Sequence, residues 1–271
     1  MSYQFLTVER AGGIERVTLN RPDVRNAFNE QVIADLTAWA KGAHDDPTLR
    51  VVVFAGAGKV FSAGADAAWM AKMASYSHDD NVLDARAGAA MFLAINTIPA
   101  VVIGRIHGAA LGGGSGLAAV CDIVIAADDA IFGFTETKLG ILPAMISPYV
   151  LQKIGASAAR DLFLTGRRFD ANKGKEIGLV HEVVAVSELD AAVDRFVNEA
   201  LSASPSAVAR SKALIQNVIG HAPADVMGIT ADAIAAQRVS PEGQEGLKAF
   251  LEKRAPSWTA RPSSTKATSD K

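Results

Sequence analysis

Two glycine-rich stretches have the residue pattern in this sequence that most suggests chemistry. They are GAGKVFSAGAD at 56–66 and HGAALGGGSG at 107–116, and each follows a run of β-branched residues. Glycine lets a ligand approach the backbone closely, and a strand-to-helix junction leaves backbone N–H groups without a partner. Two such loops could direct two N–H donors at one oxygen as it gains charge. The pattern therefore favours an oxyanion hole, with simple close packing of the glycines as the alternative.

Other glycine motifs fail at single positions. A dinucleotide-binding G-x-G-x-x-G needs a glycine at 117 or 119, where the sequence has Leu117 and Ala119. A nucleophile elbow centred on Ser115 fails at the same leucine. These failures argue against a nicotinamide-dependent oxidoreductase and a serine hydrolase.

The elements around the loops predict an α/β core. Stretches 4–10 and 14–20 indicate a hairpin, and the β-branched runs at 50–56, 100–106 and 122–128 indicate buried strands. Between them, 29–43 and 84–98 have helical periodicity, with Val32, Leu36, Trp39, Ala40 and Ala43 on one face of the first. Alternating buried strands and helices are typical of α/β proteins.

The pattern changes near residue 188. Stretches 188–204, 206–220, 223–239 and 241–254 indicate consecutive helices with no strand between them. The end of the chain is polar and low in complexity. We therefore divide the chain into a core at 1–199, a helical region at 200–258 and a disordered tail at 259–271.

Composition limits the partners and the compartment. The chain is 49% hydrophobic and 21% charged, with a net charge of −2, so we expect neither a nucleic-acid partner nor a membrane partner. The lone Cys121 excludes an internal disulfide and a cysteine-cluster zinc site, and the five histidines show no metal-binding spacing. From this pattern we expect no bound metal. Because the N-terminus does not resemble a signal peptide, we expect a cytoplasmic location.

Five ordered motifs give the chain a family resemblance. LNRPDVRNAF, VFSAGAD, HGAALGGGSGLAAVCDIVIAADDAIFGF, TETKLGILP and LTGRRFDANKGKEIGLVHEVV resemble the enoyl-CoA hydratase/isomerase family, the crotonases. Among its members, the sequence is most similar to bacterial methylglutaconyl-CoA and carboxygeranoyl-CoA hydratase-like proteins. The resemblance implies an α/β superhelix of ββα units with a C-terminal helical trimerisation region. Homotrimers or dimers of trimers are then expected.

The same resemblance assigns the site. The oxyanion donors would be the N–H groups of Ala65 and Gly113. The acyl-CoA substrate would contact the residues that match the family's binding segments: Val24, Arg25, Ala27, Ala63, Asp66, Ala67, Gly112, Phe250 and Lys253. CoA is part of the substrate, so no separate cofactor is expected. In a trimer, Phe250 and Lys253 would reach the nucleotide of a bound CoA.

Only one of the family's two usual glutamates is present. The first position holds Gly116, and the second holds Glu136, whose alternative role is a surface salt bridge. One glutamate can deprotonate water and return the proton to Cα, as a hydratase requires. A single base also suits Δ3–Δ2 isomerisation, and a non-catalytic acyl-CoA-binding homologue is the third reading. The hydratase is our first choice because of the subgroup resemblance.

Several other residues have two readings each. If the substrate bears its own carboxylate, Lys138, Ser147 or Tyr149 could hold it, although a surface role for Lys138 and a helix cap for Ser147 are favoured. Trp69 and Met70 are candidates for the wall of an acyl pocket, with packing in the core of the helix as an equal alternative. We expect Asp66 to cap the helix after the first loop, Cys121 to lie in the core, and His107 to be structural.

Overall fold

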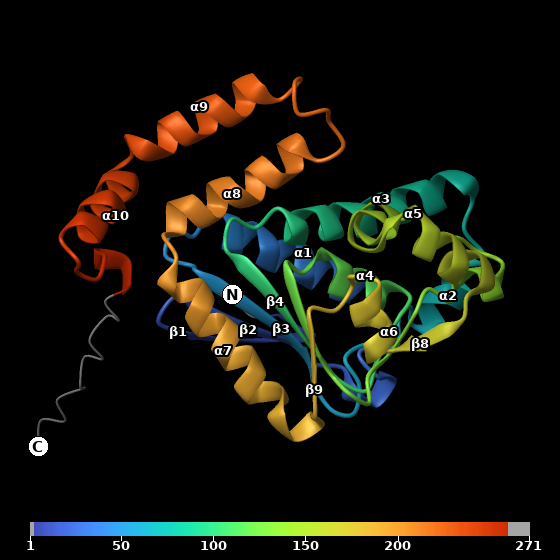
Figure 1. Ribbon diagram of the computed structural model, residues 1–271. Helices are drawn as coiled ribbons and strands as arrows, with labels where there is room; N and C mark the ends of the chain where they lie inside the picture. The colour runs from blue at the N-terminus through green and yellow to red at the C-terminus, as the bar shows by residue number, and fades with distance from the viewer. Residues whose placement is uncertain (1–2, 260–271) are drawn as a thin grey trace, which may run out of the picture.

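The structure is a computed structural model that describes residues 3–259 (Figure 1). It opens with the predicted hairpin, made of β1 (Leu6–Ala11) and β2 (Ile14–Leu19), which pair antiparallel. Gly12 and Gly13 close the turn with positive φ angles of 57° and 82°, a conformation that glycine adopts without steric cost.

A six-stranded sheet forms the centre of the core. Its order is β1-β2-β3-β4-β6-β9, with β3 (Val51–Gly56), β4 (Val101–Ile106), β6 (Ile123–Ala127) and β9 (Glu182–Val184) parallel to β2. The three predicted buried strands are β3, β4 and β6. Helices cover both faces of this sheet, which explains why these strands are continuous apolar runs.

A second, three-stranded sheet lies beside the first. Its order is β5-β7-β8, formed by β5 (Ala109–Leu111), β7 (Ile131–Gly133) and β8 (Arg168–Asp170). β5 lies inside the stretch that the sequence indicated as a loop. Three residues are too few to show strand periodicity, so no sequence pattern marks this element.

Helices on one face of the large sheet enclose the main core. The predicted helices are α1 (Glu30–His44) and α3 (His78–Asn96), which pack against each other. All the residues predicted on the inner face of α1 are buried, and Trp39 meets Phe54 of β3 edge-on, with ring centroids 5.1 Å apart. The remaining helices of the core are α2 (Ala67–Met73), α4 (Gly113–Val120), α5 (Ser147–Thr165) and α6 (Ala171–Glu176).

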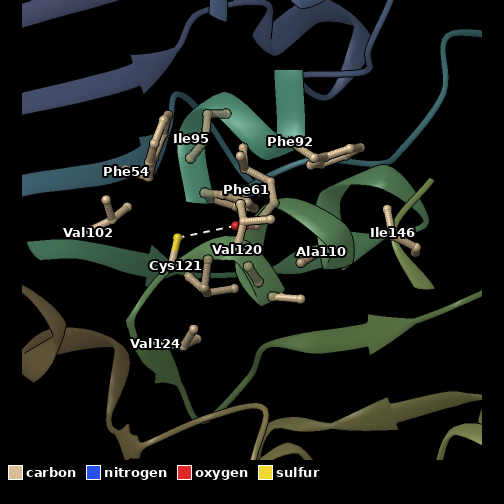
Figure 2. Packing of buried hydrophobic residues seen from close by; sticks show 14 of the residues in the cluster. Phe54, Phe61, Phe92, Ile95, Val102, Ala110, Val120, Cys121, Val124 and Ile146 are labelled. Carbon is tan, nitrogen blue, oxygen red and sulfur yellow. Dashed lines mark hydrogen bonds between the residues drawn. The ribbon is translucent and has the colours of Figure 1, made fainter. Parts of the chain in front are cut away.

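Cys121 follows α4 and is a core residue, as predicted. Its thiol donates a hydrogen bond of 3.2 Å to the carbonyl of Leu117, the dashed line in Figure 2. Burial raises the pKa of Cys121 to about 12. The thiol therefore stays protonated and is not a nucleophile.

The opposite face of the sheet is covered by α7 (Leu189–Ser202), which buries Leu189, Val193 and Val197 against β3, β4 and β6. The predicted core boundary at 199 falls within this helix, and the chain leaves the sheet only after Ser202. Beyond it, α8 (Pro205–Val218), α9 (Met227–Arg238) and α10 (Pro241–Leu251) form the arm, drawn orange to red in Figure 1. α9 begins at Met227 rather than at 223 as predicted.

Arg50 joins the arm to the core. Its guanidinium donates to the carbonyl of Leu201, near the end of α7, at 2.9 Å and to the carbonyl of Ala203, between α7 and α8, at 2.7 Å. The predicted tail lies outside the described residues, except for Thr259. No helix within residues 3–259 has the length and apolarity required to span a bilayer.

Candidate active site

The first glycine-rich loop holds Ala65 between two hydrogen bonds. The N–H of Phe28 donates to the carbonyl of Gly64 at 2.7 Å, and the N–H of Asp66 donates to the carbonyl of Phe28 at 2.8 Å. These bonds form a bridge between Phe28 and Ala65. The N–H of Ala65 has no acceptor among residues 3–259 and is free for a ligand.

Asn26 fixes the loop from beneath. Its Nδ2 donates to the carbonyls of Ala57 and Val60 at 2.8 and 2.9 Å, and its Oδ1 accepts the N–H of Arg21 at 2.9 Å. The side chain is 1% exposed, and its backbone has a φ of 54°, in the left-handed region that asparagine tolerates. A buried, fully bonded amide thus sets the path of the chain before the first glycine-rich loop.

Asp66 caps α2, as predicted. Its Oδ1 accepts the N–H of Ala68 at 2.8 Å, and its Oδ2 pairs with Arg21 at 3.0 Å. Burial alone would raise the pKa of Asp66, but the N–H groups of Ala68 and Trp69 together with Arg21 lower it. The carboxylate is therefore charged and committed to the protein.

The second glycine-rich loop leads directly into α4. Gly112 precedes the helix with a φ of 51°, and its N–H donates to the carbonyl of Gly133 at 2.8 Å. Gly113 is the first residue of α4, so its N–H has no partner within the helix. This N–H lies at the positive end of the helix, where a developing negative charge is stabilised.

Ser62 binds the two loops to each other. Its N–H donates to the carbonyl of Ala109 at 2.9 Å, and its carbonyl accepts the N–H of Leu111 at 3.0 Å. A β-carbon on Gly114 would lie 2.7 Å from the Ser62 carbonyl oxygen, so only glycine permits this approach. The two candidate oxyanion donors are consequently carried on one rigid unit.

A cavity of about 230 Å³ opens between these loops. Ala65, Gly113 and Glu136 all line it, so the structure brings the two free donors and the predicted acid together. The remaining wall is mostly apolar, and α2, α3 and the segment 139–146 supply most of it. It consists of Phe28, Ile33, Ala63, Gly64, Trp69, Met70, Met73, Gly88, Met91, Phe92, Gly112, Thr135, Leu139, Ile141, Leu142, Pro143, Ala144, Met145 and Ile146.

Glu136 begins a 3-10 turn, η2 (Glu136–Leu139), just beyond β7. Its Oε2 is buried and has no hydrogen-bond partner among the described residues, which argues against a salt-bridge role. Its Oε1 would lie 3.3 Å from a β-carbon on Gly112, so the carboxyl group faces the second loop. Burial raises the pKa of Glu136 above its usual range, which suits proton transfer near neutral pH.

Gly116 is packed against apolar side chains. A β-carbon there would overlap Cγ2 of Ile146 and lie 3.3 Å from Cζ of Phe92. Figure 2 shows both side chains within the buried cluster. Among residues 3–259, Glu136 is therefore the one acidic residue that lines the cavity, and apolar side chains fill the space next to Gly116.

Comparisons with known proteins identify the family of this chain. A model of the family described as "Enoyl-CoA hydratase/isomerase" matches residues 9–261. The chain belongs to this family, the crotonases. A relative from Mycobacterium tuberculosis named "Probable enoyl-CoA hydratase echA8" is 35% identical over 262 residues, covering 96% of this chain and 100% of the relative.

Solved crotonase structures confirm the predicted fold. The crystal structure of an enoyl-CoA hydratase from Shewanella pealeana matches with a TM-score of 0.91 and 38% identity, covering 94% of this chain and 96% of that one. An enoyl-CoA hydratase/isomerase from Marinobacter aquaeolei matches with a TM-score of 0.89 and 38% identity, covering 95% of this chain and 100% of that one.

The other CoA-contact candidates of this crotonase lie in two places. Ala63 and Gly112 line the cavity, and Val24, Arg25, Ala27 and Ala67 lie in the segments beside the first loop. Phe250 and Lys253 lie in and just after α10, which Figure 1 places on the opposite side of the chain from α2. Phe250 is 81% exposed. Within one chain these two residues are therefore remote from the cavity.

The candidates for a distal carboxylate site do not line the cavity. Lys138 faces a separate recess with Arg167 and Arg168. Ser147 is the first residue of α5 rather than its cap, and its hydroxyl donates to the carbonyl of Ala144 at 2.8 Å. Tyr149 packs near Phe92, with ring centroids 6.2 Å apart. The structure thus agrees with the favoured surface role of Lys138, whereas the favoured cap role of Ser147 is wrong.

Structural roles predicted elsewhere are supported. His107 bonds through Nε2 to the carbonyl of Gly58 at 3.0 Å and does not line the cavity. Trp69 and Met70 line the cavity, which is one of the two roles considered for them. Sequence reasoning missed Met73, Met91, Met145 and Ile146, which meet only through the fold. No local sequence pattern marks them as members of one site.

Proposed function

We propose that this crotonase is an enoyl-CoA hydratase that adds water to a 2-enoyl-CoA thioester. One observation carries the proposal: the Glu136 carboxyl group, whose Oε2 is buried without a hydrogen-bond partner among the described residues, lies in the same cavity as the free N–H groups of Ala65 and Gly113. The names of the relatives support hydration over other reactions of the family.

The proposed reaction uses one carboxylate twice. Glu136 removes a proton from water as the oxygen forms a bond to Cβ, and the C=C electrons move toward the thioester carbonyl. The resulting enolate oxygen accepts hydrogen bonds from Ala65 and Gly113. Glu136 then returns the proton to Cα, so one water is added and the enzyme is restored. CoA enters as part of the substrate, and these steps require no further cofactor.

A second candidate is Δ3–Δ2-enoyl-CoA isomerisation. The packing of Ile146 against Gly116 favours it, because a second carboxylate to hold a water is absent from this position. In that reaction Glu136 would take a proton from C2 of a 3-enoyl thioester and return it to C4. The intermediate is a dienolate, whose charged thioester oxygen would be stabilised by the same two N–H donors.

Assays with conjugated and unconjugated thioesters separate these functions. We expect wild type to consume the conjugation of a 2-enoyl-CoA, and Glu136→Gln to reduce the rate by about 10²–10⁴-fold, the usual contribution of a positioned acid/base. The exposed Glu188→Gln is a matched control with the same change of charge. Formation of conjugation from a 3-enoyl-CoA, without hydration, would establish the isomerase instead. Binding of acyl-CoA with neither reaction would indicate a non-catalytic homologue.

We also propose that the arm forms the subunit contacts of a homotrimer or of a dimer of trimers. Large apolar side chains on α8–α10 are exposed in the single chain, among them Ile215, Ile229, Ile234 and Leu247. In such an assembly Phe250 and Lys253 would reach a neighbour's CoA. We also propose a cytoplasmic location, since the free thiol of Cys121 is consistent with a reducing compartment. Light scattering would give the oligomeric state, and a monomer would contradict this assembly.

A further inference from the structure

The acyl cavity has an unusual wall. Four of the six methionines of the sequence line it: Met70, Met73, Met91 and Met145. A methionine side chain is unbranched and polarisable, and it adapts to irregular apolar shapes. This wall can therefore follow an apolar chain but offers no fixed polar contact.

The charge of the lining excludes one class of acyl group. Within the described residues, no lysine, arginine or histidine lines the cavity, and Glu136 is its only ionisable residue. The indole N–H of Trp69 already donates to Asp84 at 3.3 Å. A carboxylate at the end of the acyl chain would lose its water here without gaining a cation, and it would face a second carboxyl group.

The size of the cavity sets the length of the chain. An engineered protein cavity of about 150 Å³ holds benzene, so about 230 Å³ has room for roughly nine carbons. The loops with the oxyanion donors also line this space, so part of it receives the thioester. An acyl chain of roughly six to nine carbons would then fill it.

Gly88 determines the position of the Met145 side chain in the wall of the cavity. It lies on α3 opposite Met145, and a β-carbon at Gly88 would lie 2.6 Å from the Met145 sulfur. The missing side chain lets the thioether pack against α3. Any larger residue at this position would force Met145 to move, and the room for the acyl chain would change.

We propose that this site selects thioesters with an uncharged acyl chain of medium length, and that the contact between Gly88 and Met145 sets its depth. The inference rests on the acyl-CoA chemistry proposed above. It goes beyond that chemistry by naming the substrate class and two specificity-determining residues.

The test compares ratios between substrates. We expect kcat/KM to rise from crotonyl-CoA to 2-octenoyl-CoA by at least about tenfold, since each buried methylene contributes about fourfold. Glutaconyl-CoA and 5-methyl-2-hexenoyl-CoA have similar shapes but differ in charge, and we expect the uncharged one to be preferred by at least about tenfold. Equal kcat/KM values for crotonyl-CoA and 2-octenoyl-CoA, or a preference for glutaconyl-CoA, would overturn the inference.

Variants connect the selectivity to the two residues. Gly88→Ala should lower the ratio of kcat/KM for 2-octenoyl-CoA to kcat/KM for crotonyl-CoA. Met145→Ala should raise the corresponding ratio for 2-enoyl-CoA substrates with longer chains. Gly42→Ala is the matched control, because a β-carbon at Gly42 on α1 meets nothing within 4 Å. If Gly88→Ala does not fold, Met145→Phe tests the same wall by filling it. Unchanged ratios in Met145→Ala and Met145→Phe would overturn the assignment.

Binding separates this inference from the proposed reaction. Octanoyl-CoA and butyryl-CoA have no double bond, so calorimetry measures their affinities without turnover. Tighter binding of octanoyl-CoA in a protein that turns over no enoyl-CoA would support the acyl site while the proposed reaction fails. Turnover of crotonyl-CoA with equal affinities for the two ligands would support the reaction and overturn the acyl site.

Discussion

Ile146 occupies the space that a side chain at Gly116 would need. A β-carbon on Gly116 would overlap Cγ2 of Ile146 and lie 2.9 Å from its Cβ. Ile146 is 2% exposed and belongs to the main core, so it cannot simply swing into solvent. The shapes of Gly116 and Ile146 are thus complementary. The packing around position 116 leaves no room for the side chain of a second glutamate.

This packing predicts that a glutamate cannot be restored by one substitution. Gly116→Glu forces a carboxyl group into the core beside Ile146, and overpacking of this kind costs about 1–3 kcal/mol. We expect Gly116→Glu to lower the free energy of unfolding and the activity together. Denaturant unfolding and the hydration assay measure the two effects.

Removing Ile146 from the same site should reverse part of the loss. In Gly116→Glu/Ile146→Ala the new side chain has room, so we expect stability above that of Gly116→Glu alone. Ile146→Ala by itself is the control and should be destabilised by about 2–5 kcal/mol. Strictly additive effects in the double variant would show that the two positions do not compete for space.

The raised pKa of Glu136 predicts the pH dependence of catalysis. Burial favours the neutral carboxylic acid, so the carboxylate that acts as base forms only at a pH above the usual range of glutamate. We therefore expect the rising limb of a kcat/KM profile above about pH 4.3, the ordinary pKa of glutamate. Glu136→Gln should lose this limb. A limb that persists in the variant would assign the titration to another group.

The raised pKa of Glu136 also predicts how stability depends on pH. As the pH rises and the carboxylate forms, activity should increase while the free energy of unfolding decreases. Because the folded pKa exceeds the unfolded pKa, the native protein loses stability as the pH rises through this interval. Glu136→Gln, which stays neutral, should be more stable than wild type at neutral pH and equal to it well below about pH 4. Thermal melts across this range test the prediction. A variant less stable at neutral pH would show that the carboxylate is stabilised by a partner.

The sequence predicted the fold and the segments that form the candidate site better than the shape of that site. The buried strands and the inner face of α1 follow from local periodicity, so they could be read directly. The glycine loops and Glu136 could be assigned because each lies within a continuous motif. The relation between Gly116 and Ile146, or between Gly88 and Met145, joins segments far apart in the chain. Local patterns contain no information on such distances, and only the folded structure supplied them.

Two variants separate the two structural roles of Asp66, the cap of α2 and the ion pair with Arg21. Asp66→Asn retains an acceptor for the cap of α2 but loses the charge that pairs with Arg21. Asp66→Ala loses both, and loss of the cap alone costs typically about 1 kcal/mol. We expect Asp66→Ala to be the less stable variant.

The pH dependence of this contribution can be predicted in sign. The folded pKa of Asp66 is lowered, so its charge stabilises the native state above the unfolded pKa and is lost as the pH falls through the folded pKa. The gap in melting temperature between wild type and Asp66→Asn should therefore close in acid. A gap that is constant with pH would indicate a steric effect.

Asn26 should control the oxyanion loop from a distance. Asn26→Ala leaves the buried carbonyls of Ala57 and Val60 without their donor, at a cost of about 1–3 kcal/mol for an unsatisfied group, and it places alanine in the left-handed region. Asn26→Gly removes the same hydrogen bonds without that backbone cost, so it should be more stable than the alanine variant by about 1–2 kcal/mol. The two variants share the loss of support beneath Ala65, and a shift of about 1 Å at a reacting group can cost roughly 10²-fold in rate. We expect both to lose kcat far more than affinity for saturated acyl-CoA. Equal losses in the two properties would assign Asn26 to stability alone.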